Sequence, residues 1–161
     1  MSKVIFFSRG GNTWKLANAI ADELGTEPQH VRKVKSLPED PDIFLGSGLY
    51  FLRPAKTVRD FIRSNDFHGK NVALFGTSTS GIGVEVLWME RLLKNRGANV
   101  VGKYFCPGKF ALRFWGKSIA IRTRRPSPED LDRAKQFARS VQERRNVKSE
   151  VGSTQPATVV P

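Results

Sequence analysis

Small and hydroxyl-bearing residues gather in a six-residue segment whose composition is typical of an anion-binding turn. The segment consists of Ser8, Arg9, Gly10, Gly11, Asn12 and Thr13. Its two glycines allow the backbone to curl so that several N–H groups point at one anion, and the hydroxyl groups can add further donors. The glycine spacing fits neither the phosphate loop of nucleotide hydrolases nor the dinucleotide-binding fingerprint. A plain tight turn is the alternative, but the flanking hydroxyl and amide residues favour an anion site.

Two further clusters of small residues could line the same site. The first is Gly46, Ser47 and Gly48, followed by Leu49, Tyr50 and Phe51. The second covers residues 76–83 and contains Thr77, Ser78, Thr79, Ser80 and Gly81. Neighbouring side chains of an extended chain point in opposite directions, so either Tyr50 or Phe51 should be exposed or rest on a ligand. Ordinary packing beneath a loop is the alternative for these two aromatic residues.

Each cluster follows a short apolar run, and helical patterns separate the runs. The runs cover residues 4–7, 30–34, 43–45, 72–75 and 99–105, and their length and their β-branched and aromatic content indicate strands. Helices are expected from an N-cap at Asn12 or Thr13 to a stop at Gly25, from Pro54, over residues 84–96, and from a cap at Ser127. Nearly all-apolar strands that alternate with helices predict a parallel sheet covered on both faces.

We therefore predict an α/β fold of three layers, with a doubly wound five-stranded parallel sheet in the order 2-1-3-4-5. Such sheets bind ligands at the carboxyl ends of the strands, where the first and third strands lie side by side. The domain should cover residues 1–145. The tail at residues 146–161 has no apolar stripe and is expected to be disordered.

The three clusters resemble the three flavin loops of flavodoxins. Residues 8–13 resemble the flavodoxin phosphate loop, Thr/Ser-x-Thr/Ser-Gly-Asn-Thr: Gly11, Asn12 and Thr13 match, while Gly10 stands where a hydroxyl residue is usual. Residues 46–51 resemble the second flavin loop and residues 77–83 the third. The similarity extends from about Lys3 to Val141, and no insertion interrupts the fifth strand, as in the short-chain type.

The resemblance implies an FMN cofactor and assigns it three groups of residues. Ser8, Arg9, Gly10, Gly11, Asn12 and Thr13 would hold the phosphate, mostly through backbone N–H groups. Gly48, Leu49, Tyr50 and Phe51 would line one face of the flavin ring, with Tyr50 or Phe51 stacked on it. Thr77, Ser78, Thr79, Ser80 and Gly81 would contact the ring edge and the ribityl chain. The implied function is carriage of one or two electrons to or from a redox partner, for which no catalytic side chain is needed.

Positive charge is the feature in which the chain departs from flavodoxins, which are typically acidic. The formal net charge is +12, and no acidic residue lies between Glu90 and Glu129, a stretch with ten lysines and arginines. This charge predicts an acidic redox protein partner or an anionic small substrate. It would also stabilise the anionic reduced flavin, so the reduction potential should be less negative than in an acidic relative.

Two other function classes are consistent with the sequence. The chain could be an FMN-dependent oxidoreductase that acts directly on a quinone or a porphyrin-type intermediate, with residues 107–125 shaping the substrate pocket. It could also be a nucleic-acid-binding module, because residues 103–125 interleave aromatic residues with cations. A solvated basic face is the favoured alternative to RNA or DNA binding.

The remaining candidate groups carry weaker signals. Lys103 and Lys109 could lower the pKa of the single cysteine, Cys106, although an inert buried thiol is the favoured interpretation. His30 and His68 have no neighbouring ligand pattern, so no metal site is expected. Neither a membrane span nor a signal-peptide core is expected, and one cysteine suits a reducing compartment, so we expect a cytoplasmic protein.

Overall fold

A parallel sheet forms the centre of the molecule in the computed structural model, which describes residues 2–37, 39, 42–108, 111–114, 117–120 and 125–153. Its strands are β1 (Lys3–Phe7), β2 (Pro28–His30), β3 (Asp42–Tyr50), β5 (Asn71–Ser78) and β6 (Asn99–Pro107), in the order β2-β1-β3-β5-β6. The short strand β4 (Arg53–Pro54) pairs antiparallel with the end of β3. The predicted fold class and strand order, counted along the parallel strands, are confirmed.

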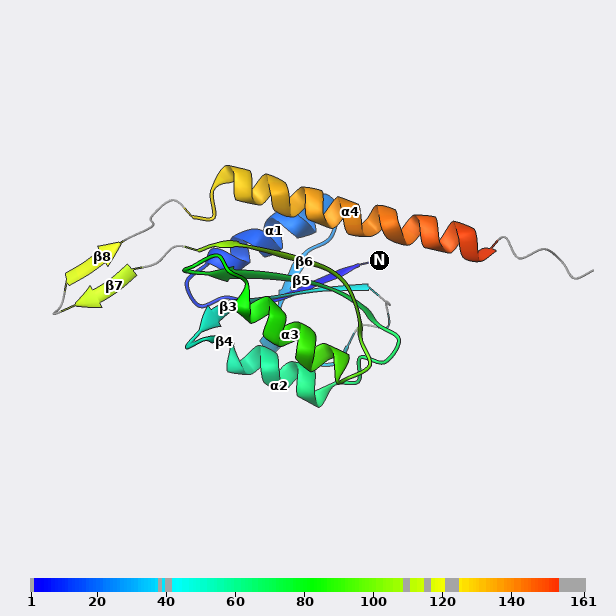
Figure 1. The fold of residues 1–161 in the computed structure, drawn as a ribbon, viewed down its shortest axis with the longest axis horizontal. Coiled ribbons are helices and arrows are strands. Elements are labelled where there is room, and N and C mark those ends of the chain that lie inside the picture. The colour runs from blue at the N-terminus through cyan, green and yellow to red at the C-terminus, as the bar shows by residue number, and fades with distance from the viewer. Residues whose placement is uncertain are drawn as a thin grey trace, which may run out of the picture.

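Helices cover both faces of the sheet, as Figure 1 shows. On one face lie α1 (Asn12–Leu24) and α4 (Pro128–Ser153), and on the other lie α2 (Lys56–Ser64) and α3 (Val84–Lys94). Each face has its own apolar core. Phe44 and Phe75 point toward α1 and α4, whereas Ile43 and Leu74 pack with α2 and α3. This alternation along strands buried on both sides explains why their sequences are almost wholly apolar.

Two strands extend through glycines that were expected to end them. The predicted third strand stopped at residue 45 and the fourth at residue 75, but β3 continues to Tyr50 and β5 to Ser78. A Cβ built on Gly46 would lie 2.1 Å from the Phe75 ring, and one on Gly76 would lie 2.5 Å from the Glu85 carboxylate. These glycines therefore permit close packing inside the strands and do not break them.

The second strand was predicted at the wrong residues. The sequence favoured residues 30–34, but β2 comprises Pro28–His30 and is followed by a 3₁₀ turn at Val31–Lys33. Within this turn the imidazole Nδ1 of His30 accepts a hydrogen bond of 3.3 Å from the backbone N–H of Arg32. The edge position of β2 tolerates Pro28, since proline lacks the N–H that an inner strand would need.

The helix ends show which capping signals were correct. Gly25 ends α1 in the left-handed conformation, as expected, but the N-cap of α1 is Gly11, with φ of 82° and no side-chain capping bond, and not Asn12 or Thr13. Ser127 and Asp130 cap the start of α4 reciprocally: the Ser127 N–H donates to the Asp130 carboxylate, and the Asp130 N–H donates to the Ser127 hydroxyl. Helix α4 continues to Ser153, so the tail does not begin at residue 146 as expected; residues 154–161 lie outside the described residues.

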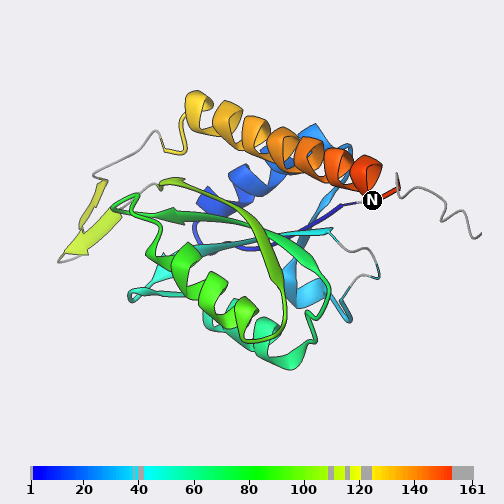
Figure 2. The same ribbon diagram turned by 45° about the vertical axis from the view of Figure 1, so that its right-hand side comes forward.

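A two-stranded hairpin follows β6 and was not predicted from the sequence. It consists of β7 (Ala111–Phe114) and β8 (Lys117–Ala120), paired antiparallel. Figure 2 shows this hairpin beyond the end of the main sheet, on the side where β6 ends. Part of the basic stretch thus lies near the carboxyl ends of the strands. Lys109, Phe110, Trp115, Arg122 and Arg124 lie outside the described residues.

Candidate cofactor site

A cavity of about 300 Å³ opens at the carboxyl ends of β1, β3 and β5, where the fold predicts a ligand. All three clusters of small residues contribute to its wall. It is lined by Ser8, Arg9, Gly10, Asn12, Thr13, Gly48, Leu49, Tyr50, Thr77, Ser78, Thr79 and Gly108. The structure therefore brings together most of the residues that the sequence singled out.

The first cluster places the amino terminus of α1 at this cavity. Gly11 turns the chain in the left-handed conformation, which favours glycine, and the Lys15 N–H donates to the Gly11 carbonyl to begin the helix. Since no side chain caps this terminus, its partial positive charge faces the cavity. A Cβ built on Gly10 meets nothing within 4 Å, so the segment leaves open space there.

Two threonine hydroxyl groups join the first and third clusters. Thr13 Oγ1 and Thr77 Oγ1 lie 2.9 Å apart in a hydrogen bond, and both side chains are buried. Gly108, just after β6, completes this wall, and its N–H donates to the Ser78 carbonyl over 2.9 Å. A Cβ on Gly108 would lie 2.8 Å from the Asn12 amide nitrogen, so any larger residue here would displace the Asn12 side chain. Sequence reasoning missed Gly108, although its position directly after the fifth strand was an available signal.

Tyr50 is the aromatic side chain of the second cluster that the structure places in the cavity wall. Its hydroxyl accepts a hydrogen bond of 2.9 Å from the backbone N–H of Arg9, and its ring meets Phe7 edge-on at 5.9 Å between centroids. The Arg9 guanidinium lies over the same ring, 5.2 Å from its centroid. Burial raises the pKa of the Tyr50 hydroxyl, which keeps it protonated at neutral pH.

Four predicted site residues do not line this cavity. Gly11 lies behind it as the N-cap of α1, while Ser80 and Gly81 lie further along the third loop. Phe51 is 97% exposed at the tip of the β3–β4 turn. The expectation that one of the two adjacent aromatic residues would be exposed is confirmed. The cofactor roles of all these residues stay predictions.

Cys106 does not have the properties of a reactive thiol. The side chain is buried in the core beneath α1 and α4. Burial, with a smaller contribution from the neighbouring Asp130 carboxylate, raises the pKa of the thiol to about 12. The suggested lowering of this pKa by Lys103 is wrong, because Lys103 pairs with Glu90 at 2.7 Å and is not among the groups that affect Cys106. Lys109 lies outside the described residues.

Glu85 is a buried carboxyl group that sequence analysis did not single out. It lies in the first turn of α3, directly above Gly76 of β5, and its side chain is fully buried. Neither carboxylate oxygen has a hydrogen-bond partner among the described residues. Burial raises the pKa of Glu85 to about 7. Its signal in the sequence was an acidic residue in the first turn of the helix expected from residue 84, two positions after Gly83.

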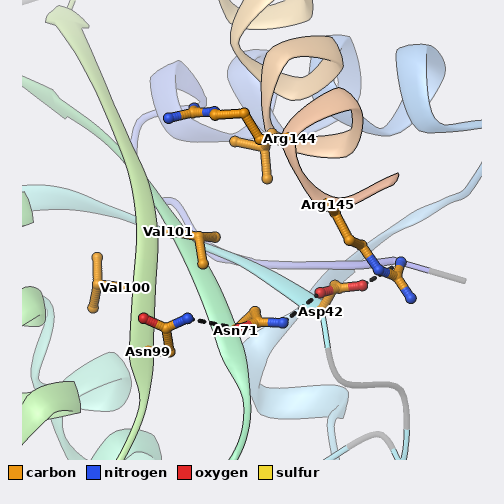
Figure 3. Close-up of a pocket in the computed structure, with 8 residues that line it drawn as sticks. Asp42, Asn71, Asn99, Val100, Val101, Arg144 and Arg145 are labelled. Atoms are coloured by element: carbon orange, nitrogen blue, oxygen red, sulfur yellow. Dashed lines mark hydrogen bonds and ion pairs between the residues drawn. The ribbon is translucent and has the colours of Figure 1, made fainter. Parts of the chain in front are cut away.

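A second cavity, of about 510 Å³, lies at the opposite end of the sheet (Figure 3). Its polar side chains form a chain of contacts across three strands. Asn99 Nδ2 donates to Asn71 Oδ1 over 2.9 Å, and Asn71 Nδ2 donates to Asp42 Oδ1 over 3.1 Å. Arg145 of α4 forms an ion pair with the other oxygen of Asp42. These groups bind one another across the cavity. We therefore interpret their contacts as structural, because they connect the sheet to α4.

Comparison with solved structures identifies the fold as that of flavodoxins. The oxidised flavodoxin 1 of Bacillus cereus superposes with a TM-score of 0.66 and 24% identity, over 88% of this chain and 97% of that one. The FMN-bound flavodoxin of Fusobacterium nucleatum gives a TM-score of 0.66 at 15% identity, over 89% and 97%. A short-chain flavodoxin associated with a bacterial microcompartment gives 0.65 at 15% identity, also over 89% and 97%.

Comparison by sequence adds a distant relative without an assigned role. An uncharacterised protein of Methanocaldococcus jannaschii is 29% identical over 135 residues, which cover 81% of this chain and 89% of the relative. No protein-family model matches the chain. In the described part of the chain, no helix is both long and apolar enough to cross a membrane.

Proposed function

We propose that this chain, which has the flavodoxin-like fold, binds FMN without a covalent link and carries one or two electrons to or from a redox partner. The observation that carries the proposal is the cavity at the carboxyl ends of β1, β3 and β5. It unites an uncapped helix terminus, several hydroxyl groups and one tyrosine ring. When bound, FMN supplies the capacity to accept and release electrons.

The amino terminus of α1 fits the phosphate group of FMN. A phosphate there would accept hydrogen bonds from backbone N–H groups of the first turn, and the helix dipole would favour its negative charge. Ser8 and Thr13 place hydroxyl groups at the same end of the cavity. The open space next to Gly10 leaves room for the phosphate oxygens.

Tyr50 and the third loop fit the remainder of the cofactor. The Tyr50 ring would pack against the flavin, since flat aromatic groups stack favourably. Thr77, Ser78 and Thr79 supply backbone and hydroxyl groups to the opposite wall. No side chain needs to act as an acid or base in this function, so the chain positions the ring and adjusts its potential.

The redox partner that fits this molecule is anionic, because the chain carries a net charge of +12. The same charge would make the flavin easier to reduce. One positive charge about 10 Å away is worth about 0.4 kcal/mol at solvent-like dielectric, and several such charges add up before screening by salt. We expect redox titration of the FMN complex to give a reduction potential less negative than that of an acidic flavodoxin measured at the same salt concentration.

The proposal is tested by titrating the purified chain with FMN and following quenching of the flavin fluorescence. Saturable quenching at a 1:1 ratio supports it. Replacing both buried hydroxyl groups, Thr13→Val with Thr77→Val, should weaken FMN binding about tenfold. One of the two hydroxyl groups donates to the other, so the pair keeps one O–H for the ligand, and the double replacement removes it. The matched control is Thr26→Val, beyond the far end of α1, which should bind as the native chain does. A chain that folds but does not quench FMN at all would contradict the proposal.

A further inference from the structure

A third cavity, of about 590 Å³, adjoins the candidate cofactor site and is strongly basic. It lies among β1, the 3₁₀ turn after β2, the β3–β4 hairpin and α2. Five cationic side chains line it, and no carboxylate of a described residue does. They are Arg9, Arg32, Arg53, Lys56 and Arg59. We call this space the cationic cavity.

Aromatic rings hold three of these guanidinium groups in place. Arg9 lies over the Tyr50 ring at 5.2 Å, Arg32 over the Phe7 ring at 5.4 Å, and Arg53 lies 5.4 Å from the centroid of the Trp88 ring. Such contacts orient a guanidinium group but leave its positive charge in place. The wall therefore presents solvent-exposed positive charges that lie against aromatic rings and are open to an anion.

Most of this charge has no counter-charge in the part of the chain that the structure describes. Lys56 pairs with Asp60 at 2.5 Å, whereas Arg9, Arg32, Arg53 and Arg59 form no ion pair with a described carboxylate. The Nε atom of Arg59 is buried and has no hydrogen-bond partner among the described residues. A buried donor without a partner destabilises the free protein, and no described group competes with an anion in the cavity for the Arg59 guanidinium group.

The lining of the cationic cavity is partly apolar. Phe7, Tyr50, Phe51, Pro54 and Ala55 contribute to it beside the charges. A volume of this size is typical of small-molecule sites, which combine an apolar surface with a few placed polar groups. The walls therefore suit a ligand that joins an apolar or aromatic body to more than one anionic group.

We propose that the cationic cavity binds a small molecule with an apolar body and at least two carboxylate or phosphate groups. Tyr50 and Arg9 line both this cavity and the candidate cofactor site, so they form the wall between the two. If FMN occupies its proposed site, the ligand lies on the other side of the Tyr50 ring from the cofactor. Only that adjacency rests on the proposed function; anion binding itself does not.

Isothermal titration calorimetry with benzene-1,3,5-tricarboxylate at low salt tests the proposal. This probe has an aromatic body and three carboxylates, and benzamide, a neutral aromatic molecule, serves as the comparison ligand. We expect 1:1 binding of the tricarboxylate and none of benzamide. Arg32→Gln and Arg59→Gln should each weaken binding about tenfold, because each removes a charged hydrogen-bond donor. If the native chain does not bind the tricarboxylate, the proposal is overturned.

The matched control is Arg63→Gln, which removes a cation from α2 one turn after Arg59 and outside the cavity. It should leave tricarboxylate binding within twofold of the native value. Equal weakening by Arg63→Gln and Arg59→Gln would mean that only the net charge matters and would overturn the assignment. Binding of decaglutamate without binding of the tricarboxylate would also overturn it, in favour of an acidic protein surface.

Titration of the same variants with FMN separates this proposal from the proposed function. Arg32 and Arg59 do not line the cofactor cavity, so FMN affinity should stay within twofold in both variants. Intact FMN binding with no tricarboxylate binding would overturn the cationic cavity alone. The native chain could instead bind the tricarboxylate, lose affinity on Arg59→Gln, and not bind FMN. That result would support an anion site in the cationic cavity and would contradict a flavin beside it.

Discussion

The two ends of the sheet carry cavities that differ more in chemistry than in form. The cavity at the amino ends of the strands has a volume of about 510 Å³, and the cofactor cavity at the carboxyl ends has about 300 Å³. In the larger cavity the polar side chains contact one another, from Asn99 through Asn71 and Asp42 to Arg145. At the carboxyl ends lie an uncapped helix terminus, the unpartnered carboxyl group of Glu85 and four arginines without an ion pair among the described residues. The comparison teaches that the presence of polar groups without a partner distinguishes the two ends of the sheet more clearly than cavity volume does.

The largest expected effect comes from a negative charge placed at the carboxyl-end cavity. Gly10→Glu introduces a carboxylate where a Cβ meets open space, so the fold should be retained. Like charges about 4 Å apart repel by about 4 kcal/mol at an effective dielectric constant of 20, so FMN affinity should fall about 1,000-fold. Gly10→Ala is the control and should bind FMN normally in the fluorescence titration. Unchanged affinity of Gly10→Glu would show that the phosphate lies elsewhere.

The buried carboxyl group of Glu85, at the carboxyl end of the sheet, should make the free energy of unfolding depend on pH. Its pKa of about 7 in the folded chain lies above its ordinary 4.5, so the folded state holds this proton more tightly. The resulting stabilisation is complete below pH 4.5 and is lost as the pH rises through about 7. Glu85→Gln should therefore be more stable than the native chain above pH 7 by about 3 kcal/mol, measured by urea unfolding. Parallel pH profiles of the two proteins between pH 4.5 and 7.5 would contradict this.

Replacing Asp42, at the opposite end of the sheet, should lower stability, whereas replacing Glu85 should raise it. Asp42→Ala leaves Arg145 without its counter-ion and Asn71 without its acceptor, so the chain should lose about 2 kcal/mol of stability. The FMN affinity of the folded variant should not change, because the two cavities lie at different ends of the sheet. A variant that keeps its stability but loses FMN would reverse the roles of the two ends.

The smallest effect is expected at Cys106, which is buried in the core near the carboxyl end of β6, opposite Thr77 of β5. With a pKa of about 12 and little exposure, the thiol should react with Ellman's reagent at pH 8 only when the chain unfolds. Cys106→Ala should cost about 1 kcal/mol and leave FMN affinity unchanged. Rapid labelling of the native protein would show that the thiol is more accessible than its packing indicates.

The elements whose apolar residues recur at the spacing of a strand or a helix could be predicted from the sequence. Apolar runs such as residues 4–7 and the cap at Ser127 are local signals, and they gave the strand order and the start of α4. The exact strand ends could not be predicted, because Gly46 and Gly76 resemble strand breakers until the rings and carboxylates packed on them are known. The β7–β8 hairpin was missed because its segment shows no clear alternation.

The candidate site was predictable in composition but not in detail. The three clusters of small residues identified most of the cavity lining, since parallel strands bring their carboxyl ends together. The cationic cavity could not be foreseen, because Arg9, Arg32, Arg53 and Arg59 come from four separate segments and meet only in the folded chain.

The tip of the β3–β4 hairpin has a consequence for contact with other molecules. Phe51 and Leu52 both have positive φ, at 49° and 62°, in a two-residue turn where asparagine and glycine are the usual choice. Each residue costs about 1 kcal/mol in that conformation, and neither recovers it by burial, because the side chains are 97% and 74% exposed. Replacing Phe51 and Leu52 by Asn and Gly would remove both the unfavourable backbone conformation and the apolar tip. The fold should then become more stable, and a molecule that docks on this tip should bind more weakly.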